Sequence, residues 1–355
     1  MKVKFGMNKF LIIVFLLLFI SCNQKEKDYE PRFWIWMHGN VENTEEDWNK
    51  IFCKLNDTGI QGVLFGGGID QLEKIISIAE KYKIDVHAWF WTMNRNDAKP
   101  EWLSVNRNGE SLAEKKAYVD YYKFMCPAIP EVRAFIKDHI RKLSKVNGLK
   151  GIHMDYVRYV DVILPEAIQP NYDLVQDYEM PEFDYGYHPY MRKLYLDEYG
   201  IDPIEIKDPE NDLQWKQFRY NKLNDAVFEI KEVTDSCNLI LSAAVFPTPE
   251  IARKLVRQDW EKWPLQMAFP MIYHEFYYKD IDWIKEATMQ GVNSLQPNQK
   301  LYTGLYIPFF RKPGELTLAL EKAFEGGASG IAVFDYKSLK DNHWQELKQY
   351  IKYRY

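Results

Sequence analysis

The stretch GIHMDYVRYV, residues 151–160, carries an acid and a base directly after an apolar run. The run is typical of a buried strand, and no turn residue separates it from Asp155 or Arg158. One reaction that such an acid can serve is glycosidic bond cleavage. It needs two carboxyl groups beside the bond, a proton donor and a nucleophile or base. Asp155 is our first candidate for one of them. The alternative is a structural carboxylate that ties down Arg158 or a loop amide.

The partner carboxyl is harder to assign. Glu275 and Asp335 each lie at or just beyond the end of a later apolar segment, and we rank them equally. Asp161 and Asp184 lie in the long segment after Asp155 and are further candidates. For glycosidic bond cleavage the sequence thus offers one assigned carboxyl, Asp155, and leaves its partner open.

Aromatic, histidine and arginine side chains near the ends of the apolar segments are candidates to bind a sugar. Aromatic rings stack on the C–H faces of sugars, and arginine binds carboxylates or acidic substrates. The candidates are Trp34, Trp36, His38, His87, Trp89, Trp91, Arg95, His153, Arg158 and Tyr273. The alternative for each aromatic ring, and for His153, is a place in the packed core.

Eight short apolar segments, each followed by a helical pattern, predict the elements that position these residues. The segments are 32–38, 62–66, 85–91, 151–157, 239–246, 266–273, 301–307 and 330–336. Strands that alternate with helices predict a parallel sheet, and eight strands close a barrel. The sequence therefore predicts the α/β class, with residues 32–355 forming one (β/α)8 TIM barrel.

The helices between these strands are also visible in the sequence. They are expected at about 44–57, 70–82, 130–146, 190–199, 212–236, 249–256, 280–290 and 314–326. Asp280 and Pro313 stand at helix-start positions, and Gly291 and the glycine pair 326–327 stand at helix-stop positions.

The connections after the third and fourth strands, residues 92–127 and 159–211, are much longer than the others. The loops that follow the strands of such a barrel form its active face. Long loops in a compact domain are usually functional or disordered, and these two are rich in Tyr, Trp and Pro. We expect both to be ordered walls of the active cleft.

Strand parity gathers the polar and large aromatic residues on one face, since side chains alternate along a strand. The predicted inward set is Trp34, Trp36 and His38, then His87, Trp89 and Trp91, then His153, Asp155 and Val157, and finally Ile331, Val333 and Asp335. In the first, third and fourth strands the opposite parity is mostly apolar and suits packing under helices. Asp155 is therefore expected to point into the barrel mouth.

Residues 1–21 have the pattern of a signal segment, with a basic start and an apolar run too short for a comfortable transmembrane helix. The run ends in LFISC, which resembles a lipoprotein signal with Cys22 as the lipidated residue. Residues 22–31 then form a polar tether. The alternative is a plain secretory signal with a chance cysteine. We expect a membrane-anchored lipoprotein of the outer membrane, facing the periplasm or the cell surface.

Composition places few other limits on function. Hydrophobic residues make up 46% and charged residues 27%, an ordinary globular balance. The aromatic fraction of 15% suits either a carbohydrate cleft or an aromatic core. A net charge of −5 gives no indication of a nucleic-acid partner, and we expect no cofactor. Cys53, Cys126 and Cys237 lack metal-type spacing and have apolar flanks, so we expect buried thiols.

Four stretches together resemble the glycoside hydrolase-like family 10 lipoproteins. They are CPAIPEVRAFIKDHIRKLSKVNGLKGIHMDYVRY (126–159), FDYGYHPYMRKLYLDEYGIDP (183–203), FPMIYHEF (269–276) and HAWFWTMNRND (87–97). The resemblance covers about residues 33–340. It implies a (β/α)8 barrel that acts on glycans, in some members on peptidoglycan strands.

The chain also departs from that family's pattern. Tyr156 stands where many members have a second Asp, Val160 replaces a proline, and Met271 replaces a glutamine. We expect a sugar other than that of the peptidoglycan-acting members. Alpha-amylase-type barrels have a similar end to their fourth strand and place the nucleophile there, which favours that role for Asp155.

Two other interpretations stay open. His38, His87, His153 and Asp155 could form a metal site at the barrel mouth, as in a metal-dependent hydrolase or deacetylase. A non-catalytic glycan-binding lipoprotein could use the same barrel. Our first expectation is a metal-free glycoside hydrolase.

The lipid anchor can be tested directly. We expect Cys22→Ala to move the protein out of the membrane fraction, because lipid chains on this residue would supply the attachment. Fractionation followed by immunoblotting measures the distribution. A Cys53→Ala variant is the matched control, and wild-type levels of membrane-bound Cys22→Ala would contradict the anchor.

Overall fold

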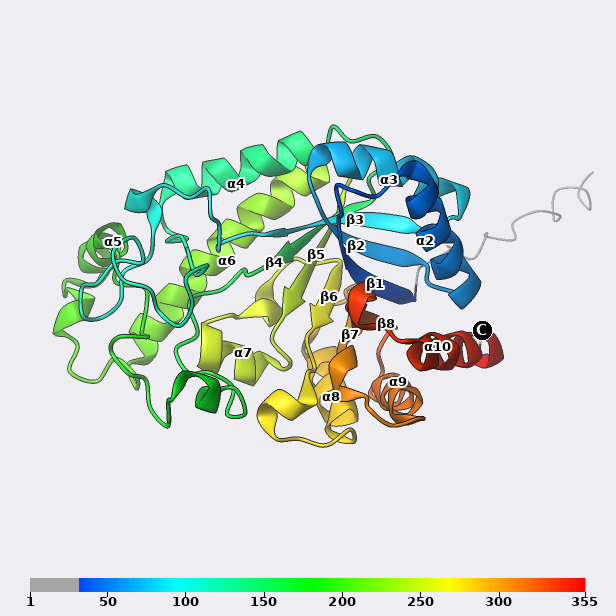
Figure 1. Ribbon diagram of the computed structural model, residues 1–355. Helices are drawn as coiled ribbons and strands as arrows, with labels where there is room; N and C mark the ends of the chain where they lie inside the picture. The colour runs from blue at the N-terminus through cyan, green and yellow to red at the C-terminus, as the bar shows by residue number, and fades with distance from the viewer. Residues whose placement is uncertain (1–31, 355) are drawn as a thin grey trace, which may run out of the picture. The chain divides into compact units, whose positions relative to one another are not determined.

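The computed structural model describes residues 32–354, which form a closed barrel of eight parallel strands (Figure 1). The strands are β1 (Phe33–His38), β2 (Gly62–Gly66), β3 (Asp85–Trp91), β4 (Gly151–Asp155), β5 (Ile240–Val245), β6 (Met267–Pro270), β7 (Lys300–Tyr306) and β8 (Gly330–Phe334). Each strand pairs with the next, and β1 closes the ring by pairing with β8. The predicted (β/α)8 TIM barrel is confirmed.

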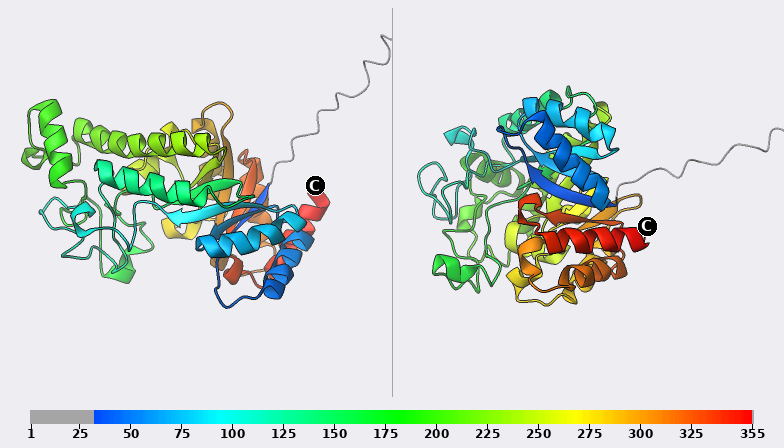
Figure 2. Two further views of the ribbon diagram at one scale, coloured as in Figure 1. Left: turned by 90° about the horizontal axis from the view of Figure 1, so that it is seen from above. Right: turned by 45° about the vertical axis from the view of Figure 1, so that its right-hand side comes forward.

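Helices surround the strands, and most of them cover the outer faces of the strands. They are α2 (Glu45–Thr58), α3 (Ile69–Lys81), α4 (Pro130–Leu143), α5 (Pro189–Tyr199), α6 (Leu213–Ser236), α7 (Pro249–Val256), α8 (Trp283–Ser294), α9 (Glu315–Glu325) and α10 (Asp341–Arg354). Helices α4 and α6 lie side by side, and α5 lies beyond them, away from the strands (Figures 1 and 2).

Two helix predictions need correction. The last helix, α10, was not expected, and it contacts α2 and α9. Helix α8 does not stop at Gly291 but continues to Ser294. A Cβ atom at Gly291 would lie 2.5 Å from Leu301 Cδ1, so this glycine allows α8 to pack closely on β7. Close packing explains the glycine better than a helix stop does.

The barrel interior is filled by large side chains of one parity. Its core comprises Trp34, Trp36, Leu64, Trp89, Ala244, Met267, Phe269, Tyr302 and Ala332. The other parity, represented by Ile35, Val86 and Ile152, belongs to the apolar layer that also contains the buried helix residues. The predicted parity is therefore correct for β1 and β3.

Strand β8 has the opposite parity to the one predicted. Ile331 and Val333 belong to the outer layer, while Ala332 belongs to the inner cluster and the Phe334 ring packs against it. The Phe334 ring lies 5.9 Å from that of Trp36 and 6.1 Å from that of Trp89. An aromatic residue that joins these rings takes the inward position, so Asp335 follows the strand on the other parity.

A buried polar network crosses the interior layer. Trp36 Nε1 donates to His153 Nε2 at 3.1 Å, and Ser242 Oγ lies 3.0 Å from Nδ1 of both His153 and His87. Both imidazoles are fully buried. Burial lowers the pKa of His87 to about 3 and holds the pKa of His153 well below its usual range. Both rings are therefore neutral at pH 7.

Trp36, His87 and His153 are packed inside the barrel, which corrects their assignment as substrate-binding residues. A Cβ atom at Gly151 would lie 2.6 Å from His87 Nε2, so the neighbouring strand leaves room only for the imidazole. Among residues 32–354, no three His, Cys, Asp or Glu side chains are grouped to hold a metal ion. The site imagined from His38, His87, His153 and Asp155 is not assembled.

Several sequence predictions concern other parts of the chain. The signal segment 1–21, Cys22 and the tether 22–31 lie outside the described residues. Within residues 32–354, no helix has the length and apolarity needed to cross a membrane.

The three cysteines of the barrel differ in exposure. Cys126 is buried as expected, but Cys237 is half-buried and Cys53 is exposed. Cys53 lies on the solvent side of the amphipathic helix α2, so its prediction as buried was wrong.

The neutral histidines predict how stability depends on pH. The folded pKa of His87 lies below its unfolded value near 6.5, so its contribution is complete above pH 6.5 and is lost as pH falls towards 3. We expect His87→Asn to reduce the acid-side slope of the unfolding free energy by up to about 1.4 kcal/mol per pH unit. Urea unfolding from pH 7 to pH 4 measures both slopes. Equal slopes would contradict buried, neutral His87.

Candidate active site

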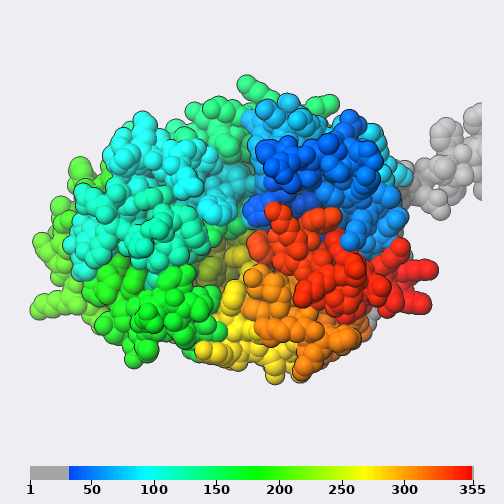
Figure 3. All heavy atoms as spheres, in the orientation of Figure 1, coloured from blue at the N-terminus to red at the C-terminus, as the bar shows by residue number. Residues whose placement is uncertain are grey.

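A cavity of about 360 Å³ lies at the carboxyl end of the barrel. It is mostly aromatic, with lining rings from Trp89, Trp91, Tyr121, Tyr122, Tyr156, Tyr172, Phe246, Tyr273, Phe276, Tyr277 and Phe334. Figure 3 shows a recess between the long segment after β4 and the carboxyl-terminal part of the chain. This is the face on which TIM barrels carry their active sites.

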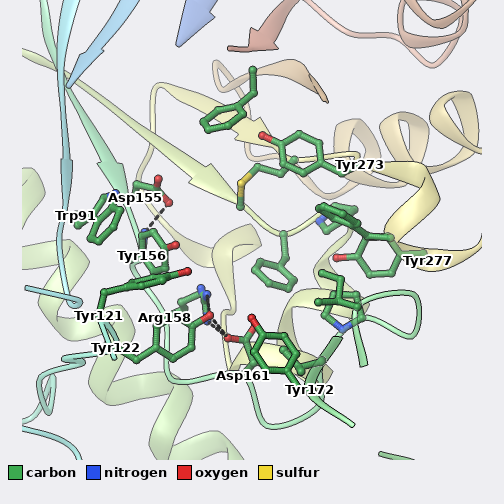
Figure 4. A pocket seen from close by; sticks show the side chains of 18 of the residues that line it. Trp91, Tyr121, Tyr122, Asp155, Tyr156, Arg158, Asp161, Tyr172, Tyr273 and Tyr277 are labelled. Carbon is green, nitrogen blue, oxygen red and sulfur yellow. Dashed lines mark hydrogen bonds and ion pairs between the residues drawn. The ribbon is translucent and has the colours of Figure 1, made fainter. Parts of the chain in front are cut away.

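Asp155 lines this cavity at the end of β4. The strand stops there because Tyr156 takes a left-handed backbone conformation with φ of 51°. That turn brings Tyr156 N within 2.7 Å of Asp155 Oδ1, while Trp89 Nε1 donates to Oδ2 at 3.0 Å. Both carboxylate oxygens therefore have an N–H donor. Figure 4 shows Asp155 beside Trp91 and Tyr156.

The pKa of Asp155 is raised above its usual range. Burial among the aromatic rings is the main cause, and the hydrogen bonds from Trp89 and Tyr156 act against it, as does the charge of Arg158. The same surroundings raise the pKa of Tyr273 well above 10, through burial first and the nearby Asp155 charge second. A carboxyl group with a raised pKa can hold a proton closer to neutral pH, which suits proton donation.

Asp161 is the second carboxylate that lines the cavity. Its Oδ2 accepts hydrogen bonds from Arg158 at 3.0 Å and from the Tyr122 hydroxyl at 2.7 Å. The Arg158 guanidinium also lies over the Tyr156 ring, 5.0 Å from its centre. Figure 4 shows Arg158 turned towards Asp161. Arg158 therefore lines the cavity as expected, and its bound carboxylate is Asp161.

Glu275 and Asp335 do not line this cavity among the residues that the structure describes. Glu275 lies in a 3₁₀ turn, His274–Tyr277, and binds Arg311 through both oxygens at 2.9 and 2.7 Å. Asp335 caps the next turn by accepting from Ser338 Oγ at 2.6 Å. Neither residue is therefore placed as the partner of Asp155, since Glu275 binds Arg311 and Asp335 binds Ser338.

Asp184, another sequence candidate, is fully buried outside the cavity. It pairs with Arg219 at 2.5 Å and lies 3.6 Å from Arg257. Burial alone would raise the pKa of Asp184, but the two arginines outweigh it and the pKa falls below its usual range. Arg257 also pairs with Glu179. These ion pairs join the segment 159–211 to α6 and to the residue that follows α7.

The remaining sequence candidates divide into two groups. His38, Trp89, Trp91 and Tyr273 line the cavity, with the His38 and Trp89 ring centres 4.5 Å apart. Burial lowers the pKa of His38, although nearby Asp335 acts in the opposite direction. Trp34 is buried in the interior cluster.

Arg95 does not line the cavity, which corrects its assignment as a substrate-binding residue. Its guanidinium binds Asp97 with two contacts of 2.8 Å and lies 5.2 Å from the Phe135 ring centre on α4. A side chain that pairs and stacks here is directed to the outside of the barrel, because α4 covers the outer face.

The two long segments do form walls of the cavity. Residues 92–127 contribute Tyr121 and Tyr122, and residues 159–211 contribute residues that include Asp161, Ile168 and Tyr172. The sequence shows the aromatic richness of both segments but did not identify Tyr121, Tyr122 or Tyr172 as lining residues, nor Tyr277, which follows β6. The signal was present only as composition, since an irregular segment has no periodicity that shows where a side chain points.

Comparisons with known proteins agree with this architecture. Residues 48–308 match the family described as "Glycosyl hydrolase-like 10". The chain belongs to this family. Membership supports a role in hydrolysing or binding glycans. The sequence matches none of the curated proteins with which it was compared.

Solved structures show the same fold at low sequence identity. The glycoside hydrolase domain of PgaB (BpsB) from Bordetella bronchiseptica has a TM-score of 0.67 at 10% identity, covering 92% of this chain and 98% of that one. The catalytic domain of a beta-amylase from Paenibacillus polymyxa has a TM-score of 0.58 at 10% identity, covering 90% and 97%. A class V chitinase from Pseudomonas fluorescens Pf-5 has a TM-score of 0.52 at 10% identity, covering 91% and 100%.

The Trp89 hydrogen bond makes the ionisation of Asp155 testable without a substrate. Trp89→Phe keeps an aromatic ring but removes the N–H that stabilises the carboxylate, so we expect the pKa of Asp155 to rise further. Titration of ¹³C-labelled aspartate carboxyls by NMR, assigned with Asp155→Asn, measures the change. Trp91→Phe is the matched control, and an unchanged pKa in Trp89→Phe would contradict the assigned contact.

Proposed function

We propose that the protein is a glycoside hydrolase that cleaves an O-glycosidic bond at Asp155. The observation that carries the proposal is the placement of this carboxyl. It lies in an aromatic cavity at the carboxyl end of the barrel, with both oxygens held by N–H donors and a raised pKa. The family to which the chain belongs supports the reaction class.

We assign Asp155 the role of proton donor. A raised pKa keeps more of the carboxyl protonated near neutral pH, whereas a nucleophile works as the carboxylate. The burial around Asp155 therefore favours a donor over the nucleophile expected from the sequence. The proton passes to the glycosidic oxygen as the bond to the anomeric carbon breaks. Water supplies the hydroxyl that completes the sugar product and the proton that restores the acid.

Asp161 is the partner that we propose for Asp155. It is the other carboxylate on the cavity wall among the described residues, and Arg158 and Tyr122 hold it in place. A fixed negative charge can stabilise the positive charge that develops on the sugar ring in the transition state. This role needs no free carboxylate, so it is compatible with the ion pair to Arg158.

The ion pair to Arg158 also favours a second candidate function. A carboxylate that is already hydrogen-bonded by an arginine and a tyrosine is less able to activate water or to attack a sugar. A glycan-binding protein without turnover would have the same aromatic cavity and the same ion pair. In that case, removing the Asp155 charge would leave sugar affinity largely unchanged and no hydrolysis would be detected.

We also propose that the protein acts while attached to a membrane through Cys22. The support is the lipoprotein-like signal in residues 1–21 and the polar tether that follows it.

Asp155→Asn tests the catalytic assignment. We expect turnover to fall by about 10³-fold or more, because the proton donor is lost. The unfolding free energy should change by no more than about 1 kcal/mol. Asparagine loses one hydrogen-bond acceptor but also removes a charge that burial disfavours. Hydrolysis of a panel of oligosaccharides and nitrophenyl glycosides, measured beside urea unfolding of the same preparation, gives both values.

Glu275→Gln is the matched control, because it neutralises a carboxylate outside the cavity. We expect it to retain wild-type turnover. An Asp155→Asn variant that unfolds early but keeps its turnover per folded molecule would remove Asp155 from the mechanism. The Trp89→Phe variant then separates the two roles. If Asp155 is the proton donor, its higher pKa in this variant moves the alkaline limb of the pH–rate profile to higher pH. If Asp155 is the nucleophile, the same change moves the acid limb.

A further inference from the structure

The cavity has an unusual composition for a site that would bind a bare sugar. Twenty residues of the described range 32–354 line it, and none of these is Asn, Gln, Ser, Thr, Glu or Lys. Sugars carry a hydroxyl on most ring carbons, and each buried hydroxyl without a hydrogen-bond partner costs about 1–3 kcal/mol. A ligand that is polar over its whole surface would therefore leave many groups unsatisfied in this cavity.

Some of the polar groups that line the cavity are engaged with one another. Trp89 Nε1 binds Asp155, and Arg158 binds Asp161 together with the hydroxyl of Tyr122. The lining side chains that make no hydrogen bond to another described residue are His38, Trp91 and the phenols of Tyr121, Tyr156, Tyr172, Tyr273 and Tyr277. Figure 4 shows Trp91, Tyr121 and Tyr156 on the Asp155 side of the cavity and Tyr172 and Tyr277 on the opposite side, so the polar groups can bind one sugar ring beside Asp155 and the opposite side offers a second ring only two phenols.

The rest of the lining forms an apolar wall beside the phenols of Tyr172 and Tyr277. It comprises Leu164, Pro165 and Ile168 from the segment after β4, Phe246 and Pro247 after β5, and Phe276 after β6. Ala167 N donates to Phe276 O at 3.2 Å, which joins two of the three segments. Leu164 and Phe246 are nearly fully buried already, while Ile168 and Phe276 are half-buried. This wall can bury an apolar group, worth about 25 cal/mol per Å² of area removed from water.

We propose that the substrate is a small glycoside with an apolar aglycone, such as an aryl group. The inference rests on the proposed glycosidase function. The sugar ring lies at Asp155 among Trp89, Trp91 and Tyr273, and the aglycone lies against the apolar wall. The volume of about 360 Å³ agrees with this, since it is at the lower end of the roughly 300–1,000 Å³ of small-molecule sites.

Matched methyl and phenyl glycosides test the inference. We would measure the binding of both series to the full protein by calorimetry, using glucose, galactose, xylose and N-acetylglucosamine as the sugars in both anomers. For the sugar that the site accepts, we expect the phenyl glycoside to bind at least about tenfold more tightly than the methyl glycoside. Hydrolysis of the same compounds is followed separately.

Variants of the apolar wall locate the effect. Ile168→Asn should reduce the preference for phenyl about fivefold or more, because it places a polar amide where the aglycone packs. Phe276→Asn provides a second, independent test on another segment. Ile204→Asn is the matched control, since Ile204 is exposed and does not line the cavity. Thermal unfolding verifies that each variant is folded.

The outcomes separate the two proposals. Equal affinity for methyl and phenyl glycosides, or no binding by any phenyl glycoside, overturns the apolar-aglycone inference. Hydrolysis of other glycans by the wild-type protein would leave the glycosidase assignment standing in that case. A phenyl preference that Ile168→Asn and Phe276→Asn both reduce supports the inference. The same preference without any hydrolysis would overturn the glycosidase function alone, and a preference unchanged in both variants overturns the assigned wall.

Discussion

The half-buried carboxyl of Asp155 depends on two N–H groups that reach it from adjacent parts of the barrel. A charged or polar group in an apolar site is tolerated only where it is hydrogen-bonded. The register of β3 and β4 pairs Trp91 with Asp155, which places the inward Trp89 one step deeper, with its indole N–H directed at the carboxylate. The left-handed turn at Tyr156 supplies the second donor. Much of the chemistry available at the barrel mouth follows from this arrangement.

The layer beneath Asp155 contains a buried polar network. His87 and His153 both contact Ser242 Oγ through Nδ1, Ser242 donates to the Ile152 carbonyl, and Trp36 donates to His153 from β1. Because the two imidazoles are neutral, they add no positive charge below Asp155, and burial is free to raise its pKa. The interior histidines are neutral and so do not lower the pKa of Asp155. The Trp36 and Phe269 rings pack around His153.

The walls above the barrel are irregular chain held by buried ion pairs. Asp184 with Arg219, and Glu179 with Arg257, connect the segment after β4 to the chain at α6 and after α7. Leaving one partner of such a pair unmatched is strongly unfavourable, so the wall keeps a single arrangement. That arrangement brings Ala167 into contact with Phe276 at the apolar end of the cavity and Asp161 into contact with Arg158 at the polar end.

The sequence by itself determined the barrel, because eight apolar strands with intervening helical patterns and alternating side chains are local signals. It also determined that Asp155 ends the fourth strand and that the two long segments would be walls. Tertiary structure decided the partners. Asp335 lies at the end of a predicted strand and Glu275 just beyond one, but Glu275 binds Arg311 and Asp335 binds Ser338. The Glu275–Arg311 contact has no sequence signature, since it joins side chains 36 positions apart. The Asp335–Ser338 contact has the local spacing of an N-cap, but the sequence alone does not show whether such an acid caps a turn or faces a cavity. The inward face of β8 was likewise decided by the aromatic rings that Phe334 meets across the barrel.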